Sequence, residues 1–334
     1  MNMEKFALTI DSGTKGVRGI IFDEKGHERA ISSYYYTDYY VKSFGFYEAS
    51  GEMFWKGLQI VTNELKRKNP EIFQHLIGVT VAAQRDTATI VDQSGNPIRD
   101  FISWMDRRSL DQPIKMAFFW RFLFFVSGNK KYTEMFNKGT HANWIKVNEP
   151  ELWEKSKAYV LLSTYLITKL TGRMVDSKSD IAGHLPYNYK KKCWCTTNEI
   201  KKQIMPIESD KLCLLVDSCT VMGTITKAAS KVTGLPIGLP VVGSGTDKGC
   251  ETLGVGCMNA CTASVSLGTQ ATVETTTKKY LELVPFYPSF AAVDPQAYNP
   301  EVTLYSGFWM IEWFIDFFEK VLYRHSHHKK NRGF

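Results

Sequence analysis

Residues 11–16 (DSGTKG) combine the side chains and the glycines that a phosphate-binding turn uses. Glycines let backbone N–H groups approach an anion closely, and Thr14 and Lys15 could add a hydroxyl and a cation. Asp11 ends an apolar run and could hold a hydrated Mg²⁺ ion. The alternative is a β-hairpin whose turn needs glycine only for its backbone conformation.

Two further segments carry charged side chains directly after apolar runs. Gln84, Arg85 and Asp86 follow residues 77–82, and the guanidinium and carboxylate could bind the hydroxyls of a polyol. The alternative is a surface ion pair of little energetic value. Asp247 follows the glycine-rich run 243–246 and could act as a general base in phosphoryl transfer. It could equally cap a helix that starts near Lys248, and the two roles are compatible.

A fourth motif, Ser266-Leu267-Gly268-Thr269, mirrors the first turn and could bind the transferred phosphate. By itself this motif is a weak signal. The Gly-Thr turn at a strand end thus occurs twice in the chain, which is expected if two similar domains are present.

The apolar periodicity around these motifs predicts alternating strands and helices. Strand, polar turn and strand at the start of the chain indicate a β-meander rather than a dinucleotide-binding βα unit. Ser50 is a plausible N-cap. The expected strands are 6–10, 17–22, 28–35, 77–82, 89–92, 241–242, 263–267 and 271–275; the expected helices are 50–68, two stretches within 148–169 (one beginning at Pro150, one over 161–170) and 305–322.

Composition excludes several classes of protein. The chain has 334 residues, 44% hydrophobic and 22% charged, which is typical of a globular protein of about two domains rather than a disordered or collagen-like chain. The net charge is +7, and residues 324–334 contribute four of the basic side chains and no acid. The remaining charge is too small to indicate nucleic-acid binding.

The seven cysteines and the N-terminus indicate a reducing compartment. The number is odd, and residues 1–11 lack the long apolar run of a secretory signal, so we expect free thiols and a cytoplasmic protein. Cys193 and Cys195 could hold a metal, but one C-x-C pair is weak support. Residues 116–126 form a short apolar run that contains Arg121 and is far below the ~20 residues of a bilayer span. We therefore expect a buried or partly exposed helix there, and no membrane partner.

Taken together, three consecutive runs resemble the FGGY family of carbohydrate kinases, closest to its glycerol-kinase branch. They are 77–86 (IGVTVAAQRD), 89–98 (TIVDQSGNPI) and 102–109 (ISWMDRRS). The turn 11–18, the segment 176–186, the run 243–256 and residues 266–269 complete the resemblance. It implies an α/β fold of the actin-like, hexokinase-like (ribonuclease H-like) type, the cofactors ATP and Mg²⁺, and phosphorylation of a small polyol or sugar.

The resemblance also implies roles for individual residues. Asp247 matches the general base, and Asp11 matches the metal-binding acid. The residues that match sugar contacts are Gln84, Arg85, Asp86, Trp104 and Asp247; those that match phosphate contacts are Thr14, Lys15, Arg18, Gly268 and Thr269.

Three departures from the family pattern stand out. Asp86 replaces a glutamate of the glycerol-kinase branch, and Phe136 lies about where that branch has a substrate-binding tyrosine. Family members are also considerably longer. We therefore expect an N-terminal sugar-binding domain at 1–252, the beginning of a nucleotide-binding domain at 253–322, and a disordered basic tail at 323–334. Such a shortened chain could be inactive.

Two alternatives follow from the shortened second domain. The chain could be a non-catalytic remnant that binds a sugar or a partner protein. It could also form a homo-oligomer through the apolar face expected of the helix 305–322.

Overall fold

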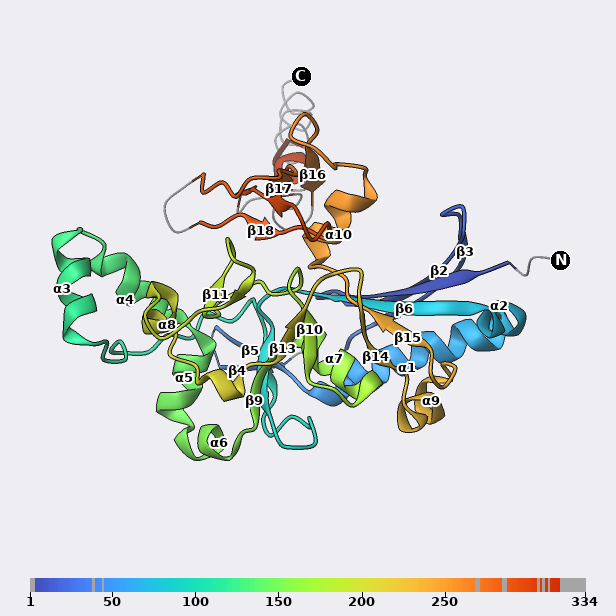
Figure 1. The fold of residues 1–334 in the computed structure, drawn as a ribbon, viewed down its shortest axis with the longest axis horizontal. Coiled ribbons are helices and arrows are strands. Elements are labelled where there is room, and N and C mark those ends of the chain that lie inside the picture. The colour runs from blue at the N-terminus through green and yellow to red at the C-terminus, as the bar shows by residue number, and fades with distance from the viewer. Residues whose placement is uncertain are drawn as a thin grey trace, which may run out of the picture. The chain divides into compact units, whose positions relative to one another are not determined.

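The computed structural model describes residues 4–37, 40–43, 45–267, 271–283, 287–304, 307, 310–311 and 313–318. The chain divides into two compact units, one formed by Met1–Cys250 with Ala291–Gln296 and the other by Glu251–Phe290 with Ala297–Phe334 (Figure 1). Each unit is described by itself.

The first unit is built on a six-stranded sheet with the order β14-β15-β6-β1-β2-β3. Its strands are β1 (Phe6–Ser12), β2 (Gly16–Asp23), β3 (Glu28–Tyr35), β6 (Leu76–Ala83), β14 (Val221–Thr224) and β15 (Pro240–Val242). β1, β2 and β3 form an antiparallel meander, which confirms the prediction from the sequence. β1, β6 and β15 run parallel to one another as neighbours. Their carboxyl ends therefore lie along one edge of the sheet.

Helices pack on this sheet because their apolar faces match its buried side. The main ones are α1 (Gly51–Lys68), α7 (Leu162–Thr171) and α9 (Lys227–Thr233), with the short α2 (Pro70–Gln74) after α1 (Figure 1). Ser50 caps α1 as predicted, since its hydroxyl accepts the Met53 N–H at 3.2 Å. The shared core includes Leu8, Ile10, Ile21, Phe54, Leu58, Leu65, Val79, Val81, Leu166 and Val241.

A second sheet of the first unit has the order β4-β5-β8-β7-β9. Its strands are β4 (Tyr40–Ser43), β5 (Phe46–Ala49), β8 (Phe101–Ile102), β7 (Ala88–Val91) and β9 (Ala158–Leu161). The sequence analysis expected two helical stretches within 148–169 and no strand between them, so it missed β9, and Leu161 ends this strand instead of beginning the helix. All four residues of β9 are buried, and they pair antiparallel with β7. A short, fully apolar run has no periodicity to separate strand from helix.

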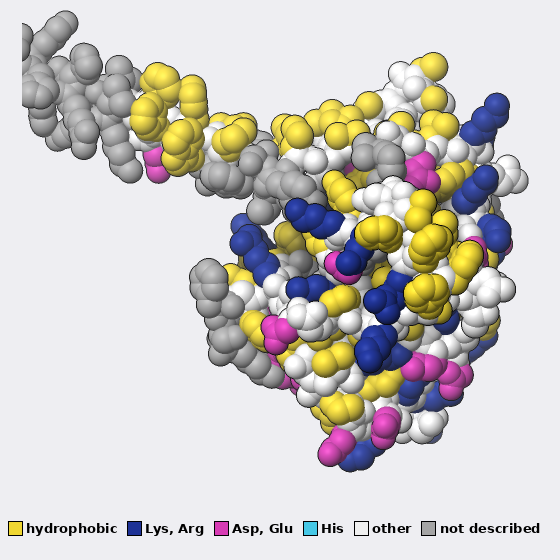
Figure 2. Space-filling view, turned by 90° about the vertical axis from the view of Figure 1, so that its left-hand side faces the viewer, with side chains coloured by type: hydrophobic (Ala, Val, Ile, Leu, Met, Phe, Trp, Pro, Cys, Tyr) yellow, Lys and Arg dark blue, Asp and Glu magenta, His cyan; other side chains and the backbone are white. Residues whose placement is uncertain are grey.

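The remaining elements of the first unit are short. They are α3 (Phe118–Val126), α4 (Lys130–Gly139), α5 (His141–Asn148), α6 (Pro150–Lys155), α8 (Ile200–Ile204), the 3₁₀ turn Ser209–Lys211, β10 (Val175–Ser177), β11 (Tyr187–Asn188), β12 (Cys193–Trp194) and β13 (Leu214–Val216). In α3 only Phe124 is buried. Figure 2 views the side on which α3 and α4 lie, where hydrophobic, basic and acidic side chains are mixed. Among the described helices, none combines the length and apolar character that crossing a membrane requires.

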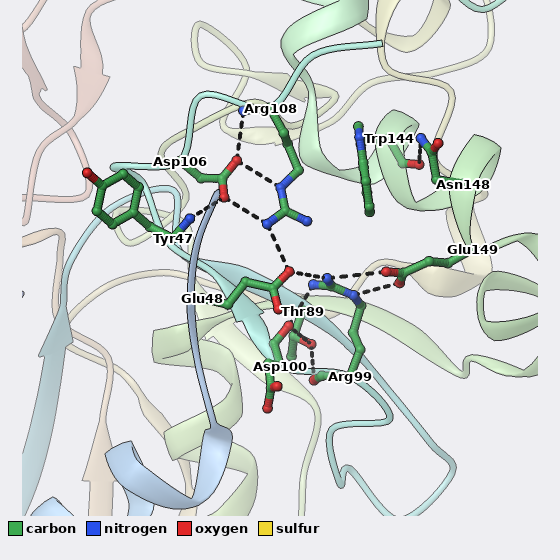
Figure 3. Close-up of polar contacts among 10 residues, drawn as sticks. All are labelled: Tyr47, Glu48, Thr89, Arg99, Asp100, Asp106, Arg108, Trp144, Asn148 and Glu149. Atoms are coloured by element: carbon green, nitrogen blue, oxygen red, sulfur yellow. Dashed lines mark hydrogen bonds and ion pairs between the residues drawn. The ribbon is translucent and has the colours of Figure 1, made fainter. Parts of the chain in front are cut away.

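A buried charge cluster ties the second sheet to the segment that follows it (Figure 3). Glu48 of β5 accepts hydrogen bonds from Nη2 of Arg99 and Nη2 of Arg108, both at 2.8 Å. Asp106 binds the Arg108 guanidinium through two 2.8 Å bonds, and Glu149 accepts from Arg99 Nε at 2.7 Å. Such a buried network is costly to break because each lost partner leaves a charge unmatched.

Arg108 also contacts two aromatic rings. Its guanidinium carbon lies 4.5 Å from the ring centroid of Trp144 (Figure 3) and 4.4 Å from that of Phe46. Cation–π contacts of this kind, away from water, add to the ionic bonds. The segment 99–108, which carries Trp104, is consequently fixed at both ends.

The second unit contains an antiparallel sheet of β16 (Ser264–Leu267), β17 (Ala271–Glu274) and β20 (Glu301–Leu304). β16 and β17 pair antiparallel, which confirms the strands predicted over 263–267 and 271–275. The further short strands are β18 (Phe290–Ala291) and β19 (Tyr298–Asn299), and α10 (Asp247–Gly254) leads from the first unit into the second. Of the predicted helix 305–322, residues 310–311 and 313–318 are described and helical. The tail 323–334 lies outside the described residues.

The close approach of β2 to β3 gives a first prediction. A Cβ at Gly16 would lie 2.3 Å from the carbonyl oxygen of Tyr34, a backbone atom that cannot move aside alone. Gly16→Ala should therefore destabilise the first unit by about 1–3 kcal/mol. The measurement is the urea midpoint of unfolding. The matched control is Gly139→Ala, since a Cβ there meets nothing within 4 Å. Equal midpoints for the two variants would contradict the register described.

Candidate functional site

Three of the four predicted motifs follow the parallel strands that share one sheet edge. In the sheet register Ser12 pairs with Ala83, and Val242 pairs with Thr80. The N–H of Gln84 donates to the carbonyl of Ser12 at 3.0 Å, which extends the β1–β6 pairing into the motif. The turn 11–16, the segment 84–86 and the turn 243–247 therefore converge, although more than 200 residues separate the first from the last. The fourth motif differs, because Gly268 and Thr269 lie outside the described residues.

A chain of hydrogen bonds connects three of the predicted residues. Trp104 Nε1 donates to the hydroxyl of Thr14 at 2.9 Å, and that hydroxyl donates to Gln84 Oε1 at 3.1 Å. The Thr14 hydroxyl thus uses its single proton within the protein. It contributes to fixing Trp104 and Gln84 relative to the turn, a role that sequence reasoning did not anticipate.

Asp11 and Arg18 face each other across β1 and β2. They are partners in the strand register, and Arg18 Nη2 lies 3.3 Å from Asp11 Oδ2. The Asp11 side chain is 40% exposed. One accessible carboxylate is a suitable protein ligand for Mg²⁺, which keeps most of its waters and takes its other oxygens from phosphates. No group of three metal-ligating side chains occurs in the part of the chain that the structure describes, and the cysteines are free thiols.

The turn before Asp247 is held by hydroxyl groups. Ser244 Oγ donates to the carbonyl of Val81 at 2.6 Å, and Ser177 Oγ donates to the carbonyl of Ser244 at 2.6 Å. Asp180 lies beside them, with Oδ2 3.3 Å from Ser244 Oγ. Burial and the neighbouring Asp176 raise the pKa of Asp180 well above its usual range. The sequence analysis did not single out Asp180, because the burial and the neighbouring charge that raise its pKa arise only in the folded chain.

Asp247 is the first residue of α10, but it does not cap the helix. The N-cap bond comes from Thr246, whose hydroxyl accepts the N–H of Gly249 at 3.2 Å. Asp247 Oδ1 instead lies 3.3 Å from Arg85 Nε and accepts the N–H of Lys248 at 2.8 Å. The carboxylate is 31% exposed. Thr246 rather than Asp247 is therefore the N-cap, and the Asp247 carboxylate contacts Arg85 and the Lys248 N–H.

Asp86 interacts with His184, a residue that the sequence analysis did not single out. The N–H of His184 donates to Asp86 Oδ1 at 2.9 Å, and His184 Nδ1 lies 2.5 Å from Asp86 Oδ2. Asp86 adopts a left-handed conformation with φ 52°, and Gly183 has φ 131°. A Cβ on Gly183 would lie 2.3 Å from Asp86 Oδ1, so glycine is required for this contact. No spacing signal could reveal a pair 98 residues apart in the chain.

Comparison with known proteins agrees with this arrangement. Residues 6–254 match the sequence model of the FGGY family of carbohydrate kinases, N-terminal domain. This chain belongs to the FGGY family. It is 27% identical over 320 residues to the xylulose kinase of Lactococcus lactis subsp. lactis (strain IL1403), covering 95% of this chain and 62% of that protein. It is 25% identical over 284 residues to the glycerol kinase of Thermococcus kodakarensis, covering 83% of this chain and 54% of that protein.

Solved structures of FGGY-type kinases share the fold. A xylulose kinase from Brucella ovis superposes with a TM-score of 0.81 at 20% identity, covering 94% of this chain and 64% of that one. A gluconate kinase from Lactobacillus acidophilus gives 0.77 at 16% identity, covering 93% and 62%. The expected actin-like, hexokinase-like fold is confirmed. The chain spans about 62% of the length of the xylulose kinase it matches, and the roles of individual residues stay predictions.

In this FGGY protein, the interaction between Asp86 and His184 shifts the pKa values of both residues. Burial acts to raise the pKa of Asp86, but the charge of His184 and its hydrogen bonds outweigh burial and lower it below 3.8. The Asp86 charge raises the pKa of His184 above 6.5. Nearby His141 behaves in the opposite way, because burial lowers its pKa to about 4.

These shifts predict how stability depends on pH. The raised pKa of His184 contributes stability that is complete below 6.5 and is lost as pH rises through the raised value. The lowered pKa of Asp86 contributes stability that is present above 3.8 and is lost as pH falls through the lowered value. The wild-type chain should therefore exceed His184→Gln in free energy of unfolding most strongly between about pH 4 and 6.5, and less at about pH 9. Urea titrations at each pH test this, and a difference independent of pH would contradict the ion pair.

Proposed function

We propose that this chain provides the sugar-binding part of a kinase that transfers the γ-phosphoryl group of ATP to a hydroxyl of a small sugar or polyol. The observation that carries this proposal is the 3.3 Å approach of Asp247 to Arg85 at the shared ends of β6 and β15. The Asp247 carboxylate is partly exposed at this strand end, and a carboxylate within hydrogen-bond reach of a bound hydroxyl can accept its proton as the new bond forms.

In the proposed reaction Asp247 takes the proton of the attacking hydroxyl. The hydroxyl oxygen forms a bond to the γ-phosphorus as the bond to the β-phosphate oxygen breaks, and ADP leaves. Arg85, with the Gln84–Thr14–Trp104 chain of hydrogen bonds, orients the sugar, and Asp86 contributes by holding His184. A positioned general base typically contributes about 10²–10⁴ in rate.

We assign ATP binding to the turn 11–16 and to Arg18, which pairs with Asp11 across β1 and β2. Lys15 is exposed and Arg18 is 61% exposed, so both can reach phosphate oxygens. Thr14 contributes chiefly through the turn, since its hydroxyl is engaged with Gln84. Mg²⁺, when bound, would neutralise phosphate charge, and Asp11 would hold it. Gly268 and Thr269 keep their predicted role as phosphate contacts.

Arg85→Ala tests the sugar site. Removing the guanidinium leaves substrate hydroxyls unmatched at a cost of about 1–3 kcal/mol, which weakens binding about tenfold or more. Calorimetric titration with glycerol, xylitol, D-xylulose, D-ribulose and D-gluconate measures the affinities. The control is Arg29→Ala, an exposed arginine of β3 that pairs with Glu4 at 2.8 Å. An affinity unchanged by Arg85→Ala would reject this site.

Asp247→Asn tests the chemistry, since asparagine keeps the shape of the side chain but is no base. Sugar affinity should stay within about fivefold while ATP-dependent transfer falls at least about a hundredfold. ADP release measures the transfer. A rate within a few-fold of wild type would contradict the role of Asp247. Sugar binding by the wild-type chain without any transfer would favour the alternative of a non-catalytic sugar-binding protein.

Two further expectations stay proposals. We expect the chain to act in the cytoplasm, with no nucleic-acid partner. Homo-oligomerisation would involve residues 305–322, of which Trp313, Phe314 and Phe317 are at least half exposed. Sedimentation of the whole chain would test that expectation.

A further inference from the structure

The His184 ring offers a hydrogen-bond donor beyond its contact with Asp86. Because the Asp86 carboxylate is ionised and Asp86 Oδ2 lies 2.5 Å from Nδ1, the Nδ1 atom must donate to it. Nε2, on the other side of the ring, has no bonding partner among the residues that the structure describes, and the side chain is 37% exposed. The arrangement resembles a histidine oriented by a carboxylate in catalytic sites, where one nitrogen is fixed and the other acts on the substrate.

A second imidazole lies next to the first. His141, at the start of α5, has its ring centroid 6.4 Å from that of His184. The residue is only 4% exposed, and its Nδ1 is buried without a hydrogen-bond partner. A buried polar atom without a hydrogen-bond partner destabilises the fold. Such an atom beside a partly open donor indicates a place where a ligand completes the hydrogen bonding.

The two rings differ in charge, which limits the ligand chemistry they suit. The Asp86 charge raises the pKa of His184, which favours the protonated ring, in which Nε2–H is a donor. His141 is neutral, and its two ring nitrogens supply one donor and one acceptor. The ring of Phe136 lies 6.1 Å from His184 and gives this end of the site an apolar wall. A charged donor against an apolar wall favours an oxygen that carries partial or full negative charge.

We propose that His184 and His141 determine substrate specificity by binding an oxygen on a trigonal carbon of the sugar. This chemistry is shared by the carbonyl of a ketose and the carboxylate of a sugar acid, and it is missing from a fully reduced polyol. The proposal rests on the proposed function and narrows its substrate class. Asp86 then acts as a positioning residue, since it orients His184.

The test compares sugars that differ only at the oxygen in question. Calorimetry measures the affinity for D-xylulose against xylitol, its reduced form, and for D-gluconate against D-glucitol. The wild-type chain should bind the carbonyl or carboxylate member of at least one pair about tenfold more tightly. The pair that shows the preference identifies which of the two oxygen types is recognised.

Two variants separate recognition from a merely structural role. His141→Phe keeps a buried ring and removes the unsatisfied Nδ1, so it should leave the urea midpoint unchanged or higher. It should nonetheless reduce the preference within the sugar pair to about threefold or less. His184→Gln keeps a hydrogen bond to Asp86 but removes the cation, with the same expected loss of preference. The control His27→Gln alters an exposed histidine that pairs with Asp23 and should leave the preference intact.

The possible outcomes test the inference separately from the proposed function on which it rests. Equal affinities within both pairs in the wild-type chain, or a preference that survives both variants, would overturn the inference while the sugar site stands. Failure to bind any of the four compounds, glycerol or D-ribulose would overturn the proposed function and the inference together, whereas binding of glycerol or D-ribulose alone would overturn only the inference. Loss of preference in both variants, with the midpoint of His141→Phe maintained, would support the inference.

Discussion

The parallel pairing of β1, β6 and β15 is the constraint on which the candidate site depends. Parallel neighbours bring their carboxyl ends to one edge of a sheet, where side chains of the following turns meet. Here that edge receives Asp11, Arg85 and Asp247 from three distant parts of the chain. A different strand order would separate these side chains even if every local turn kept its conformation.

Secondary contacts then fix the turns that leave this edge. The Ser244 hydroxyl joins the turn before Asp247 to Val81 in β6. The Glu48 cluster fixes the segment that carries Trp104, and Gly183 allows His184 to reach Asp86. Each of these contacts restricts the conformation of one side chain of the candidate site, which is how a site gains pre-organised geometry.

Local signals made much of this fold predictable. The meander of β1 to β3 follows from alternating apolar residues and glycine turns, and α1 follows from its apolar spacing and Ser50. The family motifs predict that Arg85 and Asp247 belong to one site, and the two side chains lie 3.3 Å apart. Residues 158–161 show where local reasoning fails, because an entirely buried run of four residues carries no period. His184 and His141 show a second failure, since single histidines become informative only when the fold brings them beside Asp86.

The N-cap of α10 is another feature that only the contacts of the folded chain reveal: the cap is Thr246 rather than Asp247. Both residues are good caps by type, and only the hydrogen bond from Gly249 decides between them. That small difference frees the Asp247 carboxylate for the chemistry proposed for it. Sequence thus predicted which residues belong together more successfully than it predicted what each side chain contacts.

Hydrogen–deuterium exchange in the presence and absence of bound sugar tests the central claim most directly. If one ligand occupies the shared edge of β1, β6 and β15, exchange should slow together in peptides that cover 84–86, 183–184 and 243–247. Peptides that cover α3 should be unaffected. Protection confined to one of these segments, or found in α3 instead, would contradict the account of a single site assembled by the parallel strands.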